Sequence, residues 1–315
     1  MSIEQLVLFT TDASGLERTL RLVQSLLQVV VSVPVLLAAV AAWLLPMSEK
    51  ENTAAVYEVA TMLMGARDRV NLVRRVFRMF RFIESFHSAH RLYTSLFSAP
   101  KEDEKKKAKK TRRRYDPWLD AFAATFAGLY LILETATLLD AMDVPGLAVW
   151  GPERAEMLNV EGQRYWFLSL SCSVLAGVLR MMNVTRDLPL PPPTEAEKEG
   201  NMGSRLGDGE AVNGEGEEND EKKLEALNEE RQRLRRIVQG RMTQRRIWQR
   251  ALKDRLVVLG RRVIADAVDV LLPGTIVGWT PLAPATVGYV MGFTTLLTGY
   301  EVWLRCGREA AARSA

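Results

Sequence analysis

The sequence predicts an all-α membrane protein, and three features of the chain lead to that prediction. Charge-free apolar stretches alternate with strongly charged blocks, and several of these stretches approach or exceed the roughly 20 residues that a helix needs to cross a bilayer. Another segment carries arginines on one helical face and large apolar side chains on the other. A further segment, rich in Pro, Gly and acidic residues, cannot bury a core. We therefore expect an amphipathic interfacial helix, apolar helical hairpins and a disordered acidic linker.

Composition argues against a catalytic protein. The chain has 315 residues, with 42 Lys and Arg against 38 Asp and Glu, two His and two Cys. Two cysteines cannot make a disulfide framework or a four-ligand zinc site. Glu84-Ser-Phe-His87 has the Glu-x-x-His spacing of di-iron helices, but the sequence lacks the second such pair that this site needs. We predict no catalytic residue, no metal ligand and no cofactor.

The N-terminal helical region, 1–99, contains a long charge-free segment. Leu22–Ser48 has 27 residues without a charge, which is long enough for a membrane span. It also contains Pro34, so a buried helical hairpin that bends at this proline is the alternative.

The stretch 66–93 is the most informative part of the sequence. At about 100° per residue, its arginines and its large apolar residues fall on opposite faces of one helix without internal Pro or Gly. Seven arginines against two acidic residues give 67–91 a net charge of +5, which suits the headgroup layer of an anionic membrane. The alternative is a solvated polar face over an ordinary protein core. We predict that headgroups are attracted by Arg67, Arg74, Arg78 and Arg81, and that the inserted residues are Val73, Phe77, Phe80 and Ile83.

A basic loop, 100–116, precedes an apolar helical hairpin, 117–186. Residues 101–114 carry nine basic and three acidic residues, and we interpret them as a membrane flank because no nucleic-acid-binding fold surrounds them. Within the hairpin, Glu134 is costly in lipid unless it faces protein or water. The turn of the hairpin is predicted over 144–151.

Three segments complete the chain. A disordered Pro-rich and acidic linker, 187–221, is followed by a long basic helix, 222–262, and by a C-terminal apolar membrane segment, 263–315. The last segment contains two small-xxx-small patterns, which permit close helix packing or self-association in a membrane. Their glycines are Gly274, Gly278, Gly288 and Gly292.

The order of these parts resembles the peroxisomal membrane protein 11 (peroxin-11) family. The resemblance rests on Thr10–Gln24 at the start, on Arg74-Arg-Val-Phe-Arg-Met-Phe-Arg-Phe82, and on Ala265–Leu271 with Tyr300-Glu-Val-Trp303 near the end. The Pro-rich stretch 278–284 and the acidic insert depart from the family pattern, so the chain resembles a divergent, fungal-type paralogue.

This resemblance implies a protein of the peroxisomal membrane that promotes peroxisome elongation, proliferation and fission. It implies an amphipathic helix inserted into anionic phospholipid, self-association as a homo-oligomer, and contact with the fission machinery. We expect no nucleic-acid partner and no small-molecule substrate. Two alternatives stay open, namely a channel or metabolite carrier with Glu134 or Asp266 lining a polar path, and a scaffold that recruits fission factors through 187–260.

Overall fold

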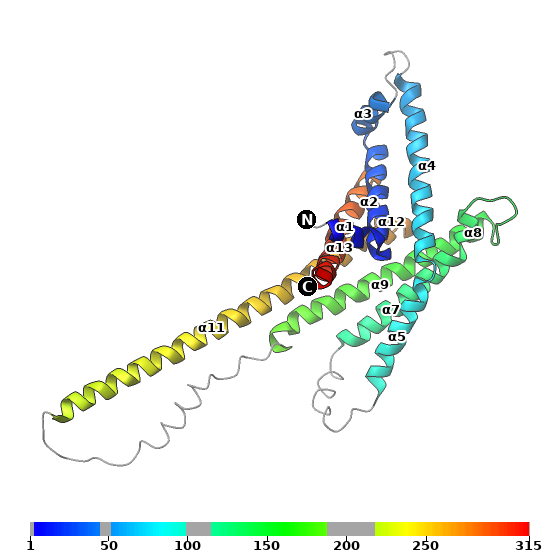
Figure 1. Cartoon of the computed structure of the whole chain (residues 1–315). Helices are drawn as coiled ribbons and strands as arrows, with labels where there is room; N and C mark the ends of the chain where they lie inside the picture. Colours follow the sequence, from blue (N-terminus) through cyan, green and yellow to red (C-terminus); the bar gives the residue numbers. More distant parts are fainter. Residues whose placement is uncertain (1–2, 45–51, 99–114, 188–217, 315) are drawn as a thin grey trace. The chain divides into compact units, whose positions relative to one another are not determined.

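The computed structural model describes residues 3–44, 52–98, 115–187 and 218–314 (Figure 1). Within these ranges the chain forms helices and short connections without a β-strand, which confirms the predicted all-α class. The sequence 101–114 and most of the predicted acidic linker lie outside the described residues.

The helices are, in chain order, α1 (Ile3–Thr11), α2 (Ala13–Ser32), α3 (Pro34–Leu44), α4 (Asn52–Arg78), α5 (Arg81–Phe97), α7 (Asp116–Ala136), α8 (Leu138–Ala141), α9 (Pro152–Asp187), α11 (Glu218–Asp269), α12 (Leu271–Val277) and α13 (Pro284–Ser314).

The chain divides into two compact units. The first comprises Met1–Arg180 and Leu259–Ala315, and the second comprises Met181–Val258. The described part of the second unit comprises the last residues of α9 and most of α11, a helix of 52 residues that covers the predicted basic helix. The candidate site described below lies within the first unit.

Helix α2 lies at the centre of the first unit, between α13 and α4, while α5 packs against α7 (Figure 1). Helix α7 also packs against α9. The rings of Tyr130 on α7 and Trp166 on α9 stack with their centroids 5.4 Å apart. The Ser169 hydroxyl of α9 donates a hydrogen bond of 2.8 Å to the carbonyl oxygen of Ala123 on α7.

The interior of this unit is unusually polar and its surface unusually apolar. Glu17, Arg21 and Glu134 are buried, whereas Trp43 and Phe80 are 80% and 67% exposed. Ionisable residues within a membrane face the interior of a helix bundle and pair there. Extensive exposed apolar surface in turn marks contact with a membrane or a partner.

Among the described residues, two helices are long and apolar enough to span a bilayer, namely α7 and the Pro152–Val184 part of α9. The pair α2 and α3 passes the same test only when its two helices are taken together, and it bends by 100° at their junction. The bend has a local cause. A residue before proline is disfavoured in the helical conformation, and Val33, which precedes Pro34, is extended with φ −109° and ψ 106°. A bend at Pro34 is part of the alternative interpretation of 22–48, and the structure has this bend.

The C-terminal glycines have different roles from one another. A Cβ atom on Gly288 would lie 2.8 Å from Val29 Cγ2, and one on Gly292 would lie 3.2 Å from Ser25 Oγ. Both glycines of α13 thus allow close approach to α2 of the same chain. Gly278 instead ends α12 with a positive φ of 86°, a conformation that glycine adopts without a Cβ clash. Gly274 is buried within α12, close to the Thr280 side chain.

Replacing Gly288 with Leu should therefore separate α13 from α2. We expect it to lower the free energy of unfolding by about 1–3 kcal/mol, the usual effect of overpacking. Gly65→Leu is the matched control, because a Cβ atom at Gly65 in α4 meets nothing within 4 Å and leucine favours the helix by up to about 1 kcal/mol over glycine. Unfolding in detergent measures both variants, and equal stability of the two would contradict the close α2–α13 contact.

Candidate functional site

The candidate site is built where α4 gives way to α5. The continuous helix predicted over 66–93 is interrupted at Met79 and Phe80. The Thr135 hydroxyl on α7 lies 3.0 Å from the Met79 carbonyl oxygen, the acceptor that the Ile83 amide would use in an unbroken helix. The Ile83 amide donates to the Phe80 carbonyl oxygen instead, at 3.1 Å. The break therefore coincides with a tertiary contact, and residues 66–93 contain no Pro or Gly beside it.

The arginine face of these helices points into the first unit. Arg74 is 6% exposed, and the side chain of Arg78 is 12% exposed. Neither side chain is on the surface of the unit, and the attraction of headgroups predicted for these two arginines stays a prediction. Arg81 is more accessible, with a side chain that is 47% exposed. Arg67 is partly buried and bonds both Asp68 and the Gln28 amide oxygen, at 2.7 and 2.8 Å.

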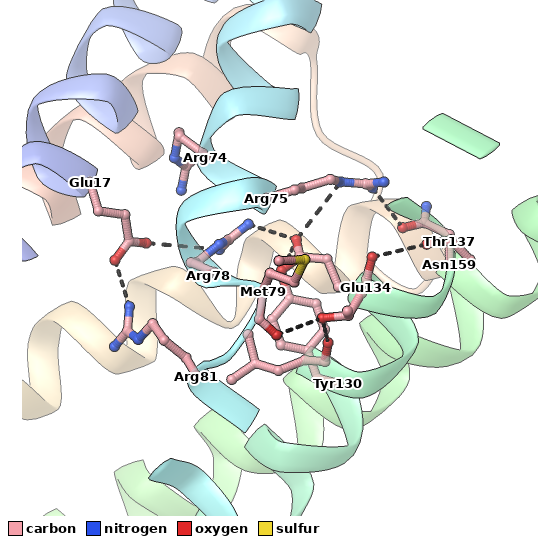
Figure 2. Close-up of polar contacts among 12 residues, drawn as sticks. Glu17, Arg74, Arg75, Arg78, Met79, Arg81, Tyr130, Glu134, Thr137 and Asn159 are labelled. Carbon is pink, nitrogen blue, oxygen red and sulfur yellow. Dashed lines mark hydrogen bonds and ion pairs between the residues drawn. The ribbon is translucent and has the colours of Figure 1, made fainter. Parts of the chain in front are cut away.

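Two buried carboxylates hold the arginine face (Figure 2). On α7, Glu134 Oε1 lies 2.6 Å from Arg78 Nη2 and accepts a hydrogen bond of 2.9 Å from the Tyr130 hydroxyl. On α2, Glu17 Oε2 lies 2.6 Å from Arg81 Nη1, and Glu17 Oε1 lies 3.9 Å from Arg78 Nη1. Arg78 therefore joins an acid of α2 to an acid of α7, and this pairing explains why the arginines face inward.

Four large apolar residues of the predicted amphipathic helix face outward. The exposed fractions are 42% for Val73, 47% for Phe77, 67% for Phe80 and 57% for Ile83. All four residues predicted to insert into a membrane are thus on the surface of the first unit, and their insertion itself stays a prediction.

A second buried ion pair stabilises the opposite side of α2. Arg21 Nη2 lies 2.6 Å from Asp269 Oδ1 at the end of α11, and it donates a hydrogen bond of 3.2 Å to Thr294 Oγ1 on α13. Arg21 and Asp269 are 5% and 6% exposed. One guanidinium therefore connects three helices.

A cavity of about 300 Å³ lies among α2, α4, α7, α9, α12 and α13. Glu134 borders this cavity, but it is paired there with Arg78. Asp266 is not among the lining residues. It accepts a hydrogen bond of 2.6 Å from Ser173, and burial raises the pKa of this carboxyl group. Of the two acids considered for a polar path, only Glu134 therefore lines this cavity.

The sequence reasoning missed Glu17, Arg21, Gln24 and Asp269 as parts of the site. The available signal was Glu134, an acid inside an apolar stretch, which had to face protein or water. An arginine-rich helix elsewhere in the chain was the natural source of its partner. Among the described residues, no group of three or more His, Cys, Asp or Glu could hold a metal ion.

In the described part of the chain, an apolar outer surface, a charged interior and two helices of spanning length define a helical membrane protein. A family model, described as peroxisomal biogenesis factor 11 (PEX11), matches residues 3–303. The chain belongs to this family of peroxisomal membrane proteins, which act in peroxisome biogenesis and proliferation. Neither a curated protein nor a solved structure matches the chain.

Proposed function

We propose that this chain promotes elongation and fission of peroxisomes by inserting the exposed apolar face of α4 and α5 into one leaflet of the membrane. The observation that carries the proposal is the exposure of Val73, Phe77, Phe80 and Ile83 on one side of the two helices. Apolar side chains that enter the acyl boundary expand one leaflet and favour curvature.

Anionic phospholipid is the proposed membrane partner. Arg81 is the arginine of this region best suited to headgroups, because its side chain is 47% exposed beside the exposed Phe80. Arg74 and Arg78 would support the same function indirectly, since their contacts with Gln24, Glu17 and Glu134 fix which face of the helices is outward.

Self-association and contact with fission factors belong to the same proposal. An oligomer would concentrate many inserted faces on one tubule, which the fission machinery then cuts. Helix α2 of the same chain already packs against Gly288 and Gly292. We therefore propose that oligomers form through another surface of the chain. Chemical cross-linking of the reconstituted chain measures self-association separately from membrane insertion.

The double variant Phe77→Ser, Phe80→Ser tests the insertion. Burial of a Phe side chain contributes about 1.5–3 kcal/mol, so removal of two exposed rings should reduce vesicle tubulation at least about tenfold. The measurement is electron microscopy of phosphatidylcholine and phosphatidylserine vesicles that contain equal amounts of full-length protein.

Val149→Ser is the control for this variant, because Val149 is 61% exposed but lies in the connection between α8 and α9. It should leave tubulation unchanged. Unaltered tubulation by the double Phe variant would overturn the insertion proposal. A conductance across planar bilayers that is lost on Glu134→Ala would favour the channel or carrier instead.

A further inference from the structure

The cavity at the centre of the first unit has an unbalanced set of charges. Arg21, Arg74, Arg75 and Arg78 line it, together with the single carboxylate Glu134. Its volume of about 300 Å³ is at the lower end for a ligand-binding pocket. It also corresponds to about ten water molecules, so water alone is the competing occupant.

Arg74 is the cation that these contacts leave unbalanced. Arg21 is paired with Asp269, and Arg78 is paired with Glu134 at 2.6 Å. Within the part of the chain that the structure describes, Arg74 has no carboxylate at ion-pair distance, and its guanidinium bonds the neutral amide oxygen of Gln24. Figure 2 shows carboxylates joined to Arg78 and Arg81 but none joined to Arg74. A buried charge without a counter-charge is costly.

The hydrogen-bonding groups of the cluster are also incomplete. The Nε atoms of Arg74, Arg75 and Arg78 are buried and have no hydrogen-bond partner among the residues that the structure describes. Arg75 Nε lies 3.8 Å from Glu134 Oε1, which is beyond hydrogen-bonding distance. Burial, with positive neighbours, lowers the pKa of Arg74 to about 9. An anion in the cavity would supply both the missing charge and the missing acceptors.

We propose that this cavity binds a phosphate group, held by Arg74, Arg75 and Arg78. Arginine pairs with phosphate through two parallel N–H donors, and a phosphate has enough oxygen atoms to accept from several guanidinium groups at once. The amides of Gln24 and Asn71, which also line the cavity, can donate to the remaining oxygens. The phosphate group belongs either to a soluble phosphate ion or to the headgroup of a phosphomonoester lipid. This site is separate from the outward apolar face and does not depend on membrane remodelling.

Calorimetric titration of the full-length chain tests the proposal in two arms. In phosphate-free maltoside micelles the probe is inorganic phosphate. In nanodiscs, the thermal unfolding midpoint of the chain is compared between phosphatidylcholine alone and phosphatidylcholine with phosphatidic acid. Binding in the first arm identifies a soluble phosphate ligand, and a raised midpoint with phosphatidic acid only identifies a lipid headgroup. Either result supports the site if it depends on Arg74.

The variant Arg74→Gln should weaken phosphate binding about tenfold to a hundredfold, the effect of losing a hydrogen bond to a charged group. Without the anion, its unfolding midpoint should equal or exceed that of the wild type, because an unbalanced buried charge has been removed. Arg69→Gln is the matched control, since Arg69 is an exposed arginine of α4, and it should bind as the wild type does.

Arg74→Lys provides a second variant, which keeps the positive charge but loses the planar fork. It should fold and bind phosphate more weakly than the wild type. No binding of either probe by the wild type, or an equal loss in Arg74→Gln and Arg69→Gln, would overturn the proposal and leave a cavity that contains water only.

Discussion

Replacing Glu134 with Gln should lower the free energy of unfolding by about 3–5 kcal/mol, the cost of removing one partner from a buried ion pair. Glu134 is 7% exposed and balances Arg78 at 2.6 Å, with Arg75 Nε at 3.8 Å. The substitution is nearly isosteric and still lets the Tyr130 hydroxyl donate to the side-chain oxygen. The decrease in the free energy of unfolding therefore measures the contribution of the negative charge of Glu134. Denaturant unfolding of the full chain in detergent, followed by tryptophan fluorescence, measures it.

Glu161→Gln is the control for Glu134→Gln. Glu161 pairs with Arg164 at 2.8 Å on the surface of α9, with side chains that are 43% and 51% exposed. Exposed pairs contribute less than about 1 kcal/mol, so this variant should unfold almost as the wild type does. Equal stability of the two variants would mean that Glu134 does not balance the arginines in the folded protein.

The Glu134 pair also shows where the sequence stops being informative. The helical wheel of 66–93 correctly divides arginines from apolar residues, because this division depends only on the helical period. Both interpretations of the wheel placed the arginines outward, toward headgroups or water. The structure turns Arg74, Arg75 and Arg78 inward, where Glu17 and Glu134 lie beside Arg78, whereas Arg69 and Arg81 are exposed. A wheel contains no information about partners in other helices.

Local signals predicted local features well. The all-α class followed from the helical segments, and the bend beside Pro34 followed from the restriction that proline imposes on Val33. The break at Met79 could not be predicted in this way, since no Pro or Gly marks it and the contact found there comes from Thr135, more than 50 residues away in the chain. The same holds for Gly288, whose partner Val29 lies in α2.

At the Arg21–Asp269 pair, we expect a single substitution to lower the free energy of unfolding much more than a double substitution does. Asp269→Asn leaves the guanidinium of Arg21, which is 5% exposed, without a counter-charge between α2, α11 and α13. We expect a loss of about 3–5 kcal/mol in the free energy of unfolding. The double variant Arg21→Met, Asp269→Leu removes both charges and should recover most of that loss, because apolar residues of similar size often replace a buried pair without cost.

Denaturant unfolding of the wild type and the two variants tests this prediction, with Asp12→Asn as the control. Asp12 pairs with Arg305, and their side chains are 31% and 47% exposed, so its substitution should change the free energy of unfolding by less than about 1 kcal/mol. Recovery in the double variant would mean that Arg21 and Asp269 are required as a balanced pair and not as individual side chains. A double variant as unstable as Asp269→Asn would contradict this, and would assign the stabilisation to the hydrogen bond between Arg21 and Thr294.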